Sequence, residues 1–493
     1  MTLNTPVGSL RQERSFRLVI VGGGPAGMAT LLAAHYEGRL NELLDAGVAI
    51  IEQGDAPGAG ALGDYAISSD SSGMTFVDCL RAPDETPLTA LCNHPLTRGL
   101  AAAGEGAVAL KEAARFLDLV GTVLRKMVSE HGNCEVLTRH TAAGVTRTAA
   151  GWRVKVQDRA GGIRFLRARN VVLCTGAHQP PERLATEYLG DSSLADSSLT
   201  ALCGDRLVQS GYVLTDEGLD DIRRRLGGIS TPRMAVIGGS TSAVAVCHAV
   251  LNRLPDVRFQ AGGVSLLHRR ELRVYYPDAA SAIREGYTEF GPDDICGISG
   301  KVFRFAGFRL DSRELVMQAR GIGGRAPEPR LRLHRLMPGN DPEALRLLAE
   351  ADVVVAALGY RPRALPVSDL DGRPVRLMAQ RGPQEPLVDD RCRVVTDAGE
   401  VLPGLFGLGL AAGFVPRGPL GGEPSFRGQA NGLWLWQKDV GGLIVSAVLG
   451  PVGGEKGVSA ASYGRPGQKT VEPVFLSSLP LRPPAASGLL YSV

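Results

Sequence analysis

Two kinds of hydrophobic pattern alternate along the first part of the chain. Residues 17–21 (RLVIV) form a β-branched run that ends in glycines, and residues 25–36 (PAGMATLLAAHY) have the spacing of a helix. We expect this helix to continue through residues 37–47 (EGRLNELLDAG), before a second apolar run at 48–52 (VAIIE). Because strands joined by one crossover helix run parallel, the pattern predicts a βαβ unit.

Residues 134–175 follow a different pattern. Short runs (CEVLT, GVTRT, WRVKV and RFLRA) alternate apolar with polar residues and are separated by Gly-containing turns, which is typical of an antiparallel meander. The segment finishes in residues 170–176 (NVVLCTG), an apolar run that ends in Gly176.

The βαβ pattern then restarts. Residues 234–238 (MAVIG) repeat the first strand, the following GSTSAVAVCHAVLNRL repeats the helix, and residues 264–270 (VSLLHRR) repeat the second strand. Residues 352–359 (DVVVAALG) echo 170–176. This internal repetition predicts two related dinucleotide-binding units, with the second inserted into the first.

The repeats define a predicted domain organisation. The fold class is α/β, with two Rossmann-like three-layer dinucleotide-binding domains and an antiparallel meander. After the last strand of the first unit, at 403–413, we expect a helix over 428–449. The predicted parts are an N-terminal extension (1–16), a first domain (17–200 and 361–450), an inserted domain (201–360) and a Gly/Pro-rich C-terminal tail (451–493).

Composition excludes several classes of protein. The 493 residues contain 54 Lys+Arg and 51 Asp+Glu, and the resulting net charge of +3 indicates neither a nucleic-acid nor a membrane partner. Apolar residues make up 44%, which excludes disorder for the bulk of the chain. The 63 glycines favour a fold with many tight turns.

The eight cysteines argue against a dithiol reductase and a structural zinc site, because they form no C-x-x-C pair and no cluster at metal-ligand spacing. Cys174 and Cys247 lie in apolar runs and are interpreted as small core residues of a reduced compartment. Residues 1–16 lack the apolar core of a signal peptide, and no stretch of about 18 apolar residues occurs. We therefore predict a cytoplasmic protein without a bound metal.

The segment GGGPAG at 22–27 matches G-x-G-x-x-G between a predicted strand and helix, which is the context that pyrophosphate binding requires. Glu52 ends the second strand and is placed to accept from ribose hydroxyls. A tight turn without a ligand is the alternative. The candidate nucleotide contacts of this turn are Gly22, Gly24, Pro25, Ala26 and Gly27.

The segment GGSTSA at 238–243 is a looser match, with Gly238 in the turn and Ser240 and Ser242 as hydroxyl donors to phosphates. Where the first unit has Glu52, the second has Arg269 and Arg270. Cations at this position favour NADPH over NADH, because they pair with the 2′-phosphate. A solvated surface pair is the alternative.

The chain resembles two-dinucleotide-binding-domain flavoproteins, among them the flavin-containing and N-hydroxylating monooxygenases. Besides the two glycine motifs, the resemblance rests on CTGAHQPP (174–181), AALGYRPR (356–363) and PGLFGLGLA (403–411). It implies that the first unit holds FAD, that the second holds NADPH, that Gly176 contacts the cofactor and that Gly409 lies near the flavin. The F-x-G-x-x-x-H fingerprint of these monooxygenases is absent before the second unit.

Further residues are candidates for the flavin face or the substrate. Ser69, Asp70 and Ser71 precede MTFVDCL, a helix that we expect to begin at a Ser cap; the resemblance places this strip beside the flavin ring. Gln429 and Asn431 lie at the start of the predicted last helix. In the insertion 271–330, we interpret the YYP and DDIC segments as surface loop rather than as a lid.

The resemblance implies an NADPH-using monooxygenase that transfers one oxygen atom of O2 to a small metabolite, at an amine nitrogen in the favoured case. The sequence leaves open an oxidase, reductase or desaturase with the same cofactors, a redox sensor, and a second unit that binds no nicotinamide. Assembly into a homo-oligomer also stays open. No acid/base catalytic residue is assigned, because the cofactor supplies this chemistry.

Overall fold

The computed structural model describes residues 13–187, 198–382 and 385–451, which belong to one compact unit. The predicted tail lies outside the described residues, apart from Pro451. No helix in the described ranges is long and apolar enough to cross a membrane.

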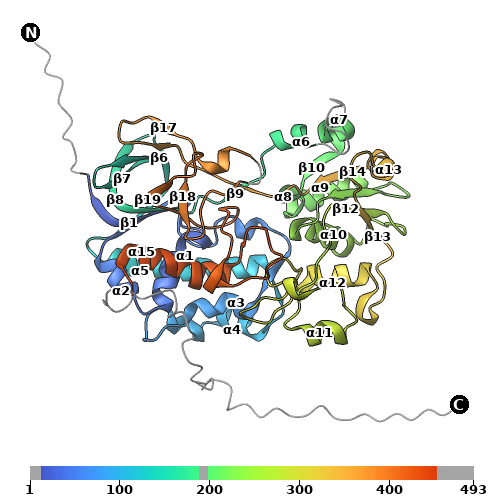
Figure 1. Cartoon of the computed structure of the whole chain (residues 1–493), viewed down its shortest axis with the longest axis horizontal. Coiled ribbons are helices and arrows are strands. Elements are labelled where there is room, and N and C mark those ends of the chain that lie inside the picture. Colours follow the sequence, from blue (N-terminus) through green and yellow to red (C-terminus); the bar gives the residue numbers. More distant parts are fainter. Residues whose placement is uncertain (1–12, 188–197, 383–384, 452–493) are drawn as a thin grey trace, which may run out of the picture. The chain divides into compact units, whose positions relative to one another are not determined.

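The first sheet is built around β1 (Ser15–Val21), which pairs parallel with β2 (Val48–Glu52) on one side and with β8 (Ile163–Leu173) on the other. Helix α1 (Pro25–Tyr36) crosses from β1 to β2, as the pattern predicts. β8 also pairs parallel with β19 (Val401–Gly407). In Figure 1, this sheet lies with α1, α5 (Leu110–Glu130) and α15 (Gly441–Leu449) on one side.

The meander comprises β6 (His140–Thr148), β7 (Gly151–Asp158) and β8, which pair antiparallel in sequence order. The expectation that CEVLT belongs to it is wrong, because β5 (Glu135–Thr138) pairs parallel with β2. An alternating strand has the same pattern in either direction, so the sequence alone did not separate the two pairings.

Two helix predictions also need correction. The helix expected over 25–47 ends at Tyr36 and resumes as α2 (Leu40–Asp45), because the chain turns at Gly38 with φ +71°. The last helix begins at Leu433, not near 428: α14 (Leu433–Leu435) passes through a π-helical turn (Trp436–Val440) into α15.

The second sheet consists of parallel strands in the order β10-β14-β11-β12-β13. β11 (Met234–Ile237) is central, β12 (Val264–His268) follows the helix α10 (Thr241–Arg253), and β14 (Val353–Ala356) pairs on the other side of β11. The remaining strands are β10 (Leu207–Gln209) and β13 (Leu331–Arg335).

The chain enters and leaves the second sheet through one ribbon. β9 (Ala177–His178) leads out of the first sheet, and β15 (Arg361–Pro362) returns antiparallel to it. All strands of the second sheet lie between these two strands in sequence, which gives the nested order of the α/β fold (Figure 1). The exact domain limits stay a prediction.

The other elements that frame the site come from the loops and the insertion. β3 (Ser68–Ser72) pairs with β4 (Ala107–Ala109), and α3 (Gly73–Val77) follows β3 through the cap of Ser72, whose hydroxyl accepts from Thr75 N at 3.3 Å. The Ser cap is therefore confirmed. The described helices that have not been named above are α4 (Pro95–Ala102), α6 (Glu182–Thr186), α7 (Leu199–Cys203), α8 (Ser210–Val213), α9 (Asp216–Leu226), α11 (Ala279–Arg284), α12 (Leu310–Ala319) and α13 (Pro342–Glu350).

Cys174 and Cys247 are buried in the cores of the two sheets, as expected of small core residues. The first core gathers β1, β2, β8 and the helices packed on them, and the second gathers β11, β12 and α10 with much of the insertion.

We predict that Gly27→Ala lowers the thermal midpoint of unfolding. A Cβ atom at Gly27 would overlap the carbonyl oxygen of Gly22, so helix α1 must move away from β1, at a cost of about 1–3 kcal/mol. Gly99→Ala, in helix α4, is the matched control, because a Cβ atom there meets nothing within 4 Å. Equal midpoints for the two variants would contradict the packing argument.

Candidate functional site

The first glycine turn lies where the strand order of the first sheet reverses, between β1 and β8. Gly22 has φ +98°, and a Cβ atom there would overlap the Cys174 carbonyl at the end of β8. Gly24 is the N-cap residue of α1 and has free space beside its Cα. Such a switch point at the carboxyl ends of parallel strands is where dinucleotides bind.

Glu52 lies against this turn. Its Oε2 accepts a hydrogen bond from Gly23 N and its Oε1 accepts one from Gly54 N, both at 2.6 Å. The carboxylate is half-buried at the end of β2. Each oxygen retains lone pairs for a hydroxyl donor. The helix α2 lengthens the crossover between the glycine turn and Glu52.

The end of β19 reaches the same turn. A Cβ atom at Gly409 would come within 2.9 Å of the Ala26 side chain, so this strand end lies against the start of α1. Asn431 Oδ1 accepts from Ala411 N at 3.2 Å and holds the turn that follows Gly409. Gly176 accepts at its carbonyl from Arg363 N at 3.0 Å, beside the β9–β15 ribbon.

These residues fit an FAD. The space beside Gly24 is open to backbone approach, α1 directs its first amides toward that space, and Glu52 lies at the ribose position. Gln429 and Asn431 do not begin a helix, which corrects the expectation that helix amides there face the flavin; the described helix starts at Leu433.

The second glycine turn repeats the first. A Cβ atom at Gly238 would come within 2.6 Å of the Ala357 carbonyl at the end of β14, as Gly22 approaches Cys174 at the end of β8. Ser240 is the N-cap residue of α10, and its hydroxyl makes no capping bond. Ser242 lies in the first turn of the helix. Both hydroxyls therefore lie where a phosphate would meet the helix N-terminus.

Arg269 and Arg270 directly follow β12, and both are exposed. A Cβ atom at Gly239 would lie 3.2 Å from His268 Cβ and 3.9 Å from Arg270 O, so this strand end adjoins the phosphate turn. Arg269 forms an ion pair with Glu187 at 3.0 Å. A 2′-phosphate at this position would compete with Glu187 for the guanidinium.

The strip at 68–72 is a strand rather than a turn. Ser69 Oγ is buried and accepts from Ser71 N at 2.9 Å, so this hydroxyl is used locally. Asp70 Oδ1 is buried and has no hydrogen-bond partner in the described part of the chain. Burial raises the pKa of Asp70 to about 7, although the charge and the backbone N–H of Arg309 oppose the shift.

The insertion contacts both β3 and the loop after Gly413. α12 packs against β3, and the buried Glu423 accepts from Phe305 N at 3.0 Å and from Ala306 N at 2.8 Å. The surface-loop interpretation of the YYP and DDIC segments is wrong for Tyr276 and Cys296, which are both buried. Burial would raise the pKa of Cys296, but hydrogen bonds from Ser299, Gly422 N and Arg304 lower it to about 6.

Sequence reasoning missed the arginines of this region. Arg273, Arg304 and Arg309 are half-buried around the insertion, each against an aromatic ring. Their signal in the sequence is the interleaving of Arg with aromatic residues in RVYY (273–276) and in VFRFAGFR (302–309).

Comparison with known proteins identifies the class. No family model matches the chain. The CMP-5′-(3-aminopropyl)phosphonate hydroxylase of Streptomyces rubellomurinus is 33% identical over 455 residues, covering 88% of this chain and 97% of the relative. The chain belongs to the family of this hydroxylase. It is a flavin-dependent oxidoreductase, so the sequence prediction of the enzyme class is confirmed.

Solved structures agree on the fold. The FAD-bound cadaverine monooxygenase of Erwinia amylovora has a TM-score of 0.52 and 13% identity, covering 91% of this chain and 98% of its own. The L-lysine 6-monooxygenase of Pseudomonas syringae has a TM-score of 0.50 and 18% identity, covering 88% and 99%. The predicted fold with two dinucleotide-binding domains is thus confirmed for this member of the hydroxylase family.

We predict that Asp70→Asn stabilises the protein increasingly as the pH rises from 4 to 8. The folded protein keeps its proton on Asp70 up to about pH 7, whereas the unfolded chain loses it near the ordinary value of 3.8, so burial of Asp70 destabilises the fold progressively across this window. The thermal midpoint of the variant minus that of the wild type should increase with pH, by about 2–4 °C per kcal/mol relieved.

Asp293→Asn, which removes an exposed carboxylate of the same insertion, is the control and should show no such trend. A pH-independent difference for Asp70→Asn would contradict the raised pKa.

Proposed function

We propose that this chain is an FAD-dependent, NADPH-using N-hydroxylase that acts on the primary amine of a small, phosphorus-containing metabolite. Its family membership carries the proposal: the relative hydroxylates an aminopropylphosphonate linked to CMP, and the likeness spans 97% of the relative. The balanced reaction is R–NH2 + O2 + NADPH + H⁺ → R–NHOH + NADP⁺ + H2O.

The FAD would be held by the turn at Gly22–Gly27, by Glu52 and by the Gly409 turn that lies against Ala26. When reduced, this cofactor would activate O2, so that one atom of O2 goes to the amine and the other to water. The chain's own contribution is to bind, orient and shield. Amides at the N-terminus of α1 favour the pyrophosphate charge, and Asn431 fixes the turn next to Gly409.

NADPH would be held by the second turn, with Ser240 and Ser242 toward the pyrophosphate and Arg269 and Arg270 toward the 2′-phosphate. The open switch point between β11 and β14 supports this placement, because it repeats the geometry of the first turn.

Aromatic side chains close the loop after Gly413 against the insertion. The rings of Phe305 and Phe426 are 5.6 Å apart, and those of Phe305 and Trp434 are 6.2 Å apart. We expect such packing to limit the access of water, which favours oxygen transfer to the amine over loss of the oxygen as H2O2. The amine reacts through its nitrogen lone pair, so the site must take up the substrate ammonium and release its proton.

The direct test is product analysis with ¹⁸O2. The purified FAD-loaded enzyme, given NADPH and the CMP conjugate of 3-aminopropylphosphonate or the free compound, should yield a product that carries one ¹⁸O atom. Reaction with hydroxylamine-specific reagents should locate that atom on nitrogen. NADPH consumption matched by H2O2, with no labelled product from either compound, would instead assign an oxidase.

We predict that replacing both Arg269 and Arg270 with Ala raises the KM for NADPH about tenfold to a hundredfold, equivalent to about 1.4–3 kcal/mol, and leaves the KM for NADH nearly unchanged. Loss of charge-assisted bonds to the 2′-phosphate is the reason. The matched control is Arg258→Ala, which removes an exposed arginine on the approach to β12. An equal rise in the KM for NADPH and NADH would show that the two arginines have a structural role.

A further inference from the structure

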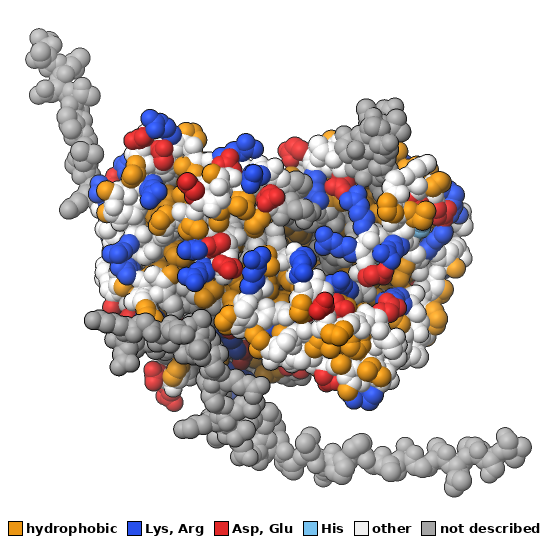
Figure 2. Space-filling model, viewed as in Figure 1, with side chains coloured by type: hydrophobic (Ala, Val, Ile, Leu, Met, Phe, Trp, Pro, Cys, Tyr) orange, Lys and Arg blue, Asp and Glu red, His pale blue; other side chains and the backbone are white. Residues whose placement is uncertain are grey.

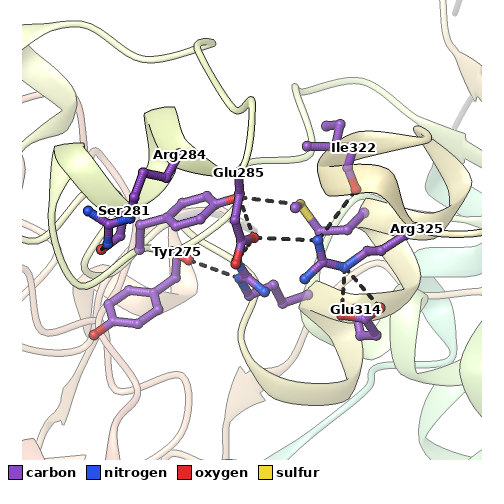
Figure 3. Close-up of polar contacts among 10 residues, drawn as sticks. Tyr275, Ser281, Arg284, Glu285, Glu314, Ile322 and Arg325 are labelled. Atoms are coloured by element: carbon purple, nitrogen blue, oxygen red, sulfur yellow. Dashed lines mark hydrogen bonds and ion pairs between the residues drawn. The ribbon is translucent and has the colours of Figure 1, made fainter. Parts of the chain in front are cut away.

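Among the described residues, three arginines of the insertion lack the carboxylate partners that their neighbours have. Figure 3 shows Glu285 and Glu314 around Arg325, with ion-pair distances of 3.4 Å and 2.8 Å. Arg313 pairs with Glu285 at 2.7 Å. Over residues 13–187, 198–382 and 385–451, by contrast, no ion pair includes Arg273, Arg304 or Arg309.

These three arginines belong to one cluster. Arg309 Nη2 donates to Arg304 O at 2.7 Å, and Phe308 N donates to Arg273 O at 2.8 Å, so the strand-like segments that carry them are directly bonded. Figure 2 shows Lys and Arg side chains, interspersed with Asp and Glu, across the middle of the visible face. An anion bound beside these bonded segments would be attracted by the positive charges that they carry.

Aromatic rings hold the guanidinium groups in place. Arg273 lies 5.1 Å from the centroid of Phe303, and Arg309 lies 3.8 Å from that of Tyr275. The Tyr275 backbone is fixed in turn, because its carbonyl accepts from Arg313 Nε at 3.3 Å, while Figure 3 shows its ring directed away from Glu285 and Arg325. The cations are therefore positioned without being neutralised.

Arg273 and Arg309 have donors to spare. Each guanidinium carries five N–H donors, and in the described residues Arg273 donates once, to Ser425 Oγ at 3.5 Å, and Arg309 once, to Arg304 O. Glu423 is close by in sequence to Ser425, but its oxygens accept from the backbone of Phe305 and Ala306. The remaining guanidinium donors suit a phosphate or phosphonate, whose oxygens accept several bonds.

A carboxyl group, which favours a cationic donor rather than an anion, lies beside this cluster. Asp70 is close enough to Arg309 to feel its charge, yet the two form no ion pair, and Asp70 Oδ1 is buried without a hydrogen-bond donor. A buried oxygen without a donor is unfavourable, so a donor from a ligand would be favourable there. The primary amine of a substrate supplies such a donor.

We propose that this cluster binds both ends of the substrate: Arg273 and Arg309, backed by Arg304, bind a phosphonate or phosphate group, and Asp70 accepts a hydrogen bond from the amine at the other end of a short alkyl chain. The assignment rests on the proposed N-hydroxylase function and names its substrate class, an aminoalkyl phosphorus anion.

Calorimetric titration of the FAD-loaded enzyme tests the subsite without turnover. The probes are 3-aminopropylphosphonate and its CMP conjugate, with propylphosphonate and propylamine as the two half-ligands. Arg273→Gln and Arg309→Gln should each weaken binding of the phosphonates at least tenfold and leave propylamine unaffected. Asp70→Asn should weaken the amine-bearing probes by a similar factor and leave propylphosphonate unaffected. Arg284→Gln, on exposed α11, is the control and should change none of them.

The outcomes separate the subsite from the reaction. If the Arg variants lose affinity only for the phosphonates and Asp70→Asn only for the amine-bearing probes, but no ¹⁸O is transferred to nitrogen, the subsite is retained and the proposed function is overturned. Oxygen transfer with unchanged affinities in the Arg273 and Arg309 variants would overturn the subsite alone. An equal loss of affinity for every probe, in a variant with the same thermal midpoint as the wild type, would also overturn the subsite. So would a wild-type enzyme that binds neither amine-bearing phosphonate.

Discussion

The structure depends on two places where backbone meets backbone with no room for a side chain. Gly22 abuts the carbonyl of Cys174, and Gly238 comes against that of Ala357, each at the point where a parallel sheet reverses its strand order. These contacts fix where α1 and α10 begin. Both helix N-termini consequently lie at the carboxyl edges of their sheets, which is where a dinucleotide gains amide donors and dipole together.

Nesting one sheet inside the other assembles the site from distant segments. The ribbon of β9 and β15 is the covalent connection, but further contacts join the parts: Ala66 N donates to Leu214 O at 2.8 Å, and Ser425 N donates to Asp293 O at 2.8 Å. The loop after Gly413 and strand β3 both contact the insertion as a result. The residues proposed to bind substrate therefore come from parts of the chain that no local pattern connects.

Local constraints made the geometry of the two glycine turns predictable, whereas the proposed substrate region could be recognised only from the fold. A glycine motif between an apolar run and a helix predicts a turn from a few residues. The similarity of 170–176 to 352–359 predicted the strands β8 and β14, which pair with β1 and β11, the strands that precede the two turns. Arg309 and Arg313 are four residues apart and look alike in sequence, yet of the two only Arg313 forms an ion pair in the described part of the chain, with Glu285. Which arginine stays unpaired is decided by tertiary contacts.

The lack of an ion pair at Arg309 is informative because neighbouring arginines of the same segment do form ion pairs. The insertion neutralises Arg313, Arg320 and Arg325 with nearby glutamates, so the same segment can build ion pairs. It nevertheless keeps Arg309 and Asp70 as neighbours without an ion pair and leaves Asp70 with a buried, unsatisfied oxygen. Such an arrangement lowers stability, since a buried polar oxygen without a hydrogen-bond donor is unfavourable. A ligand that carries both charges would explain this arrangement. A zwitterion with an amine and a phosphorus anion is such a ligand, because its amine would donate to Asp70 and its anion would pair with Arg309.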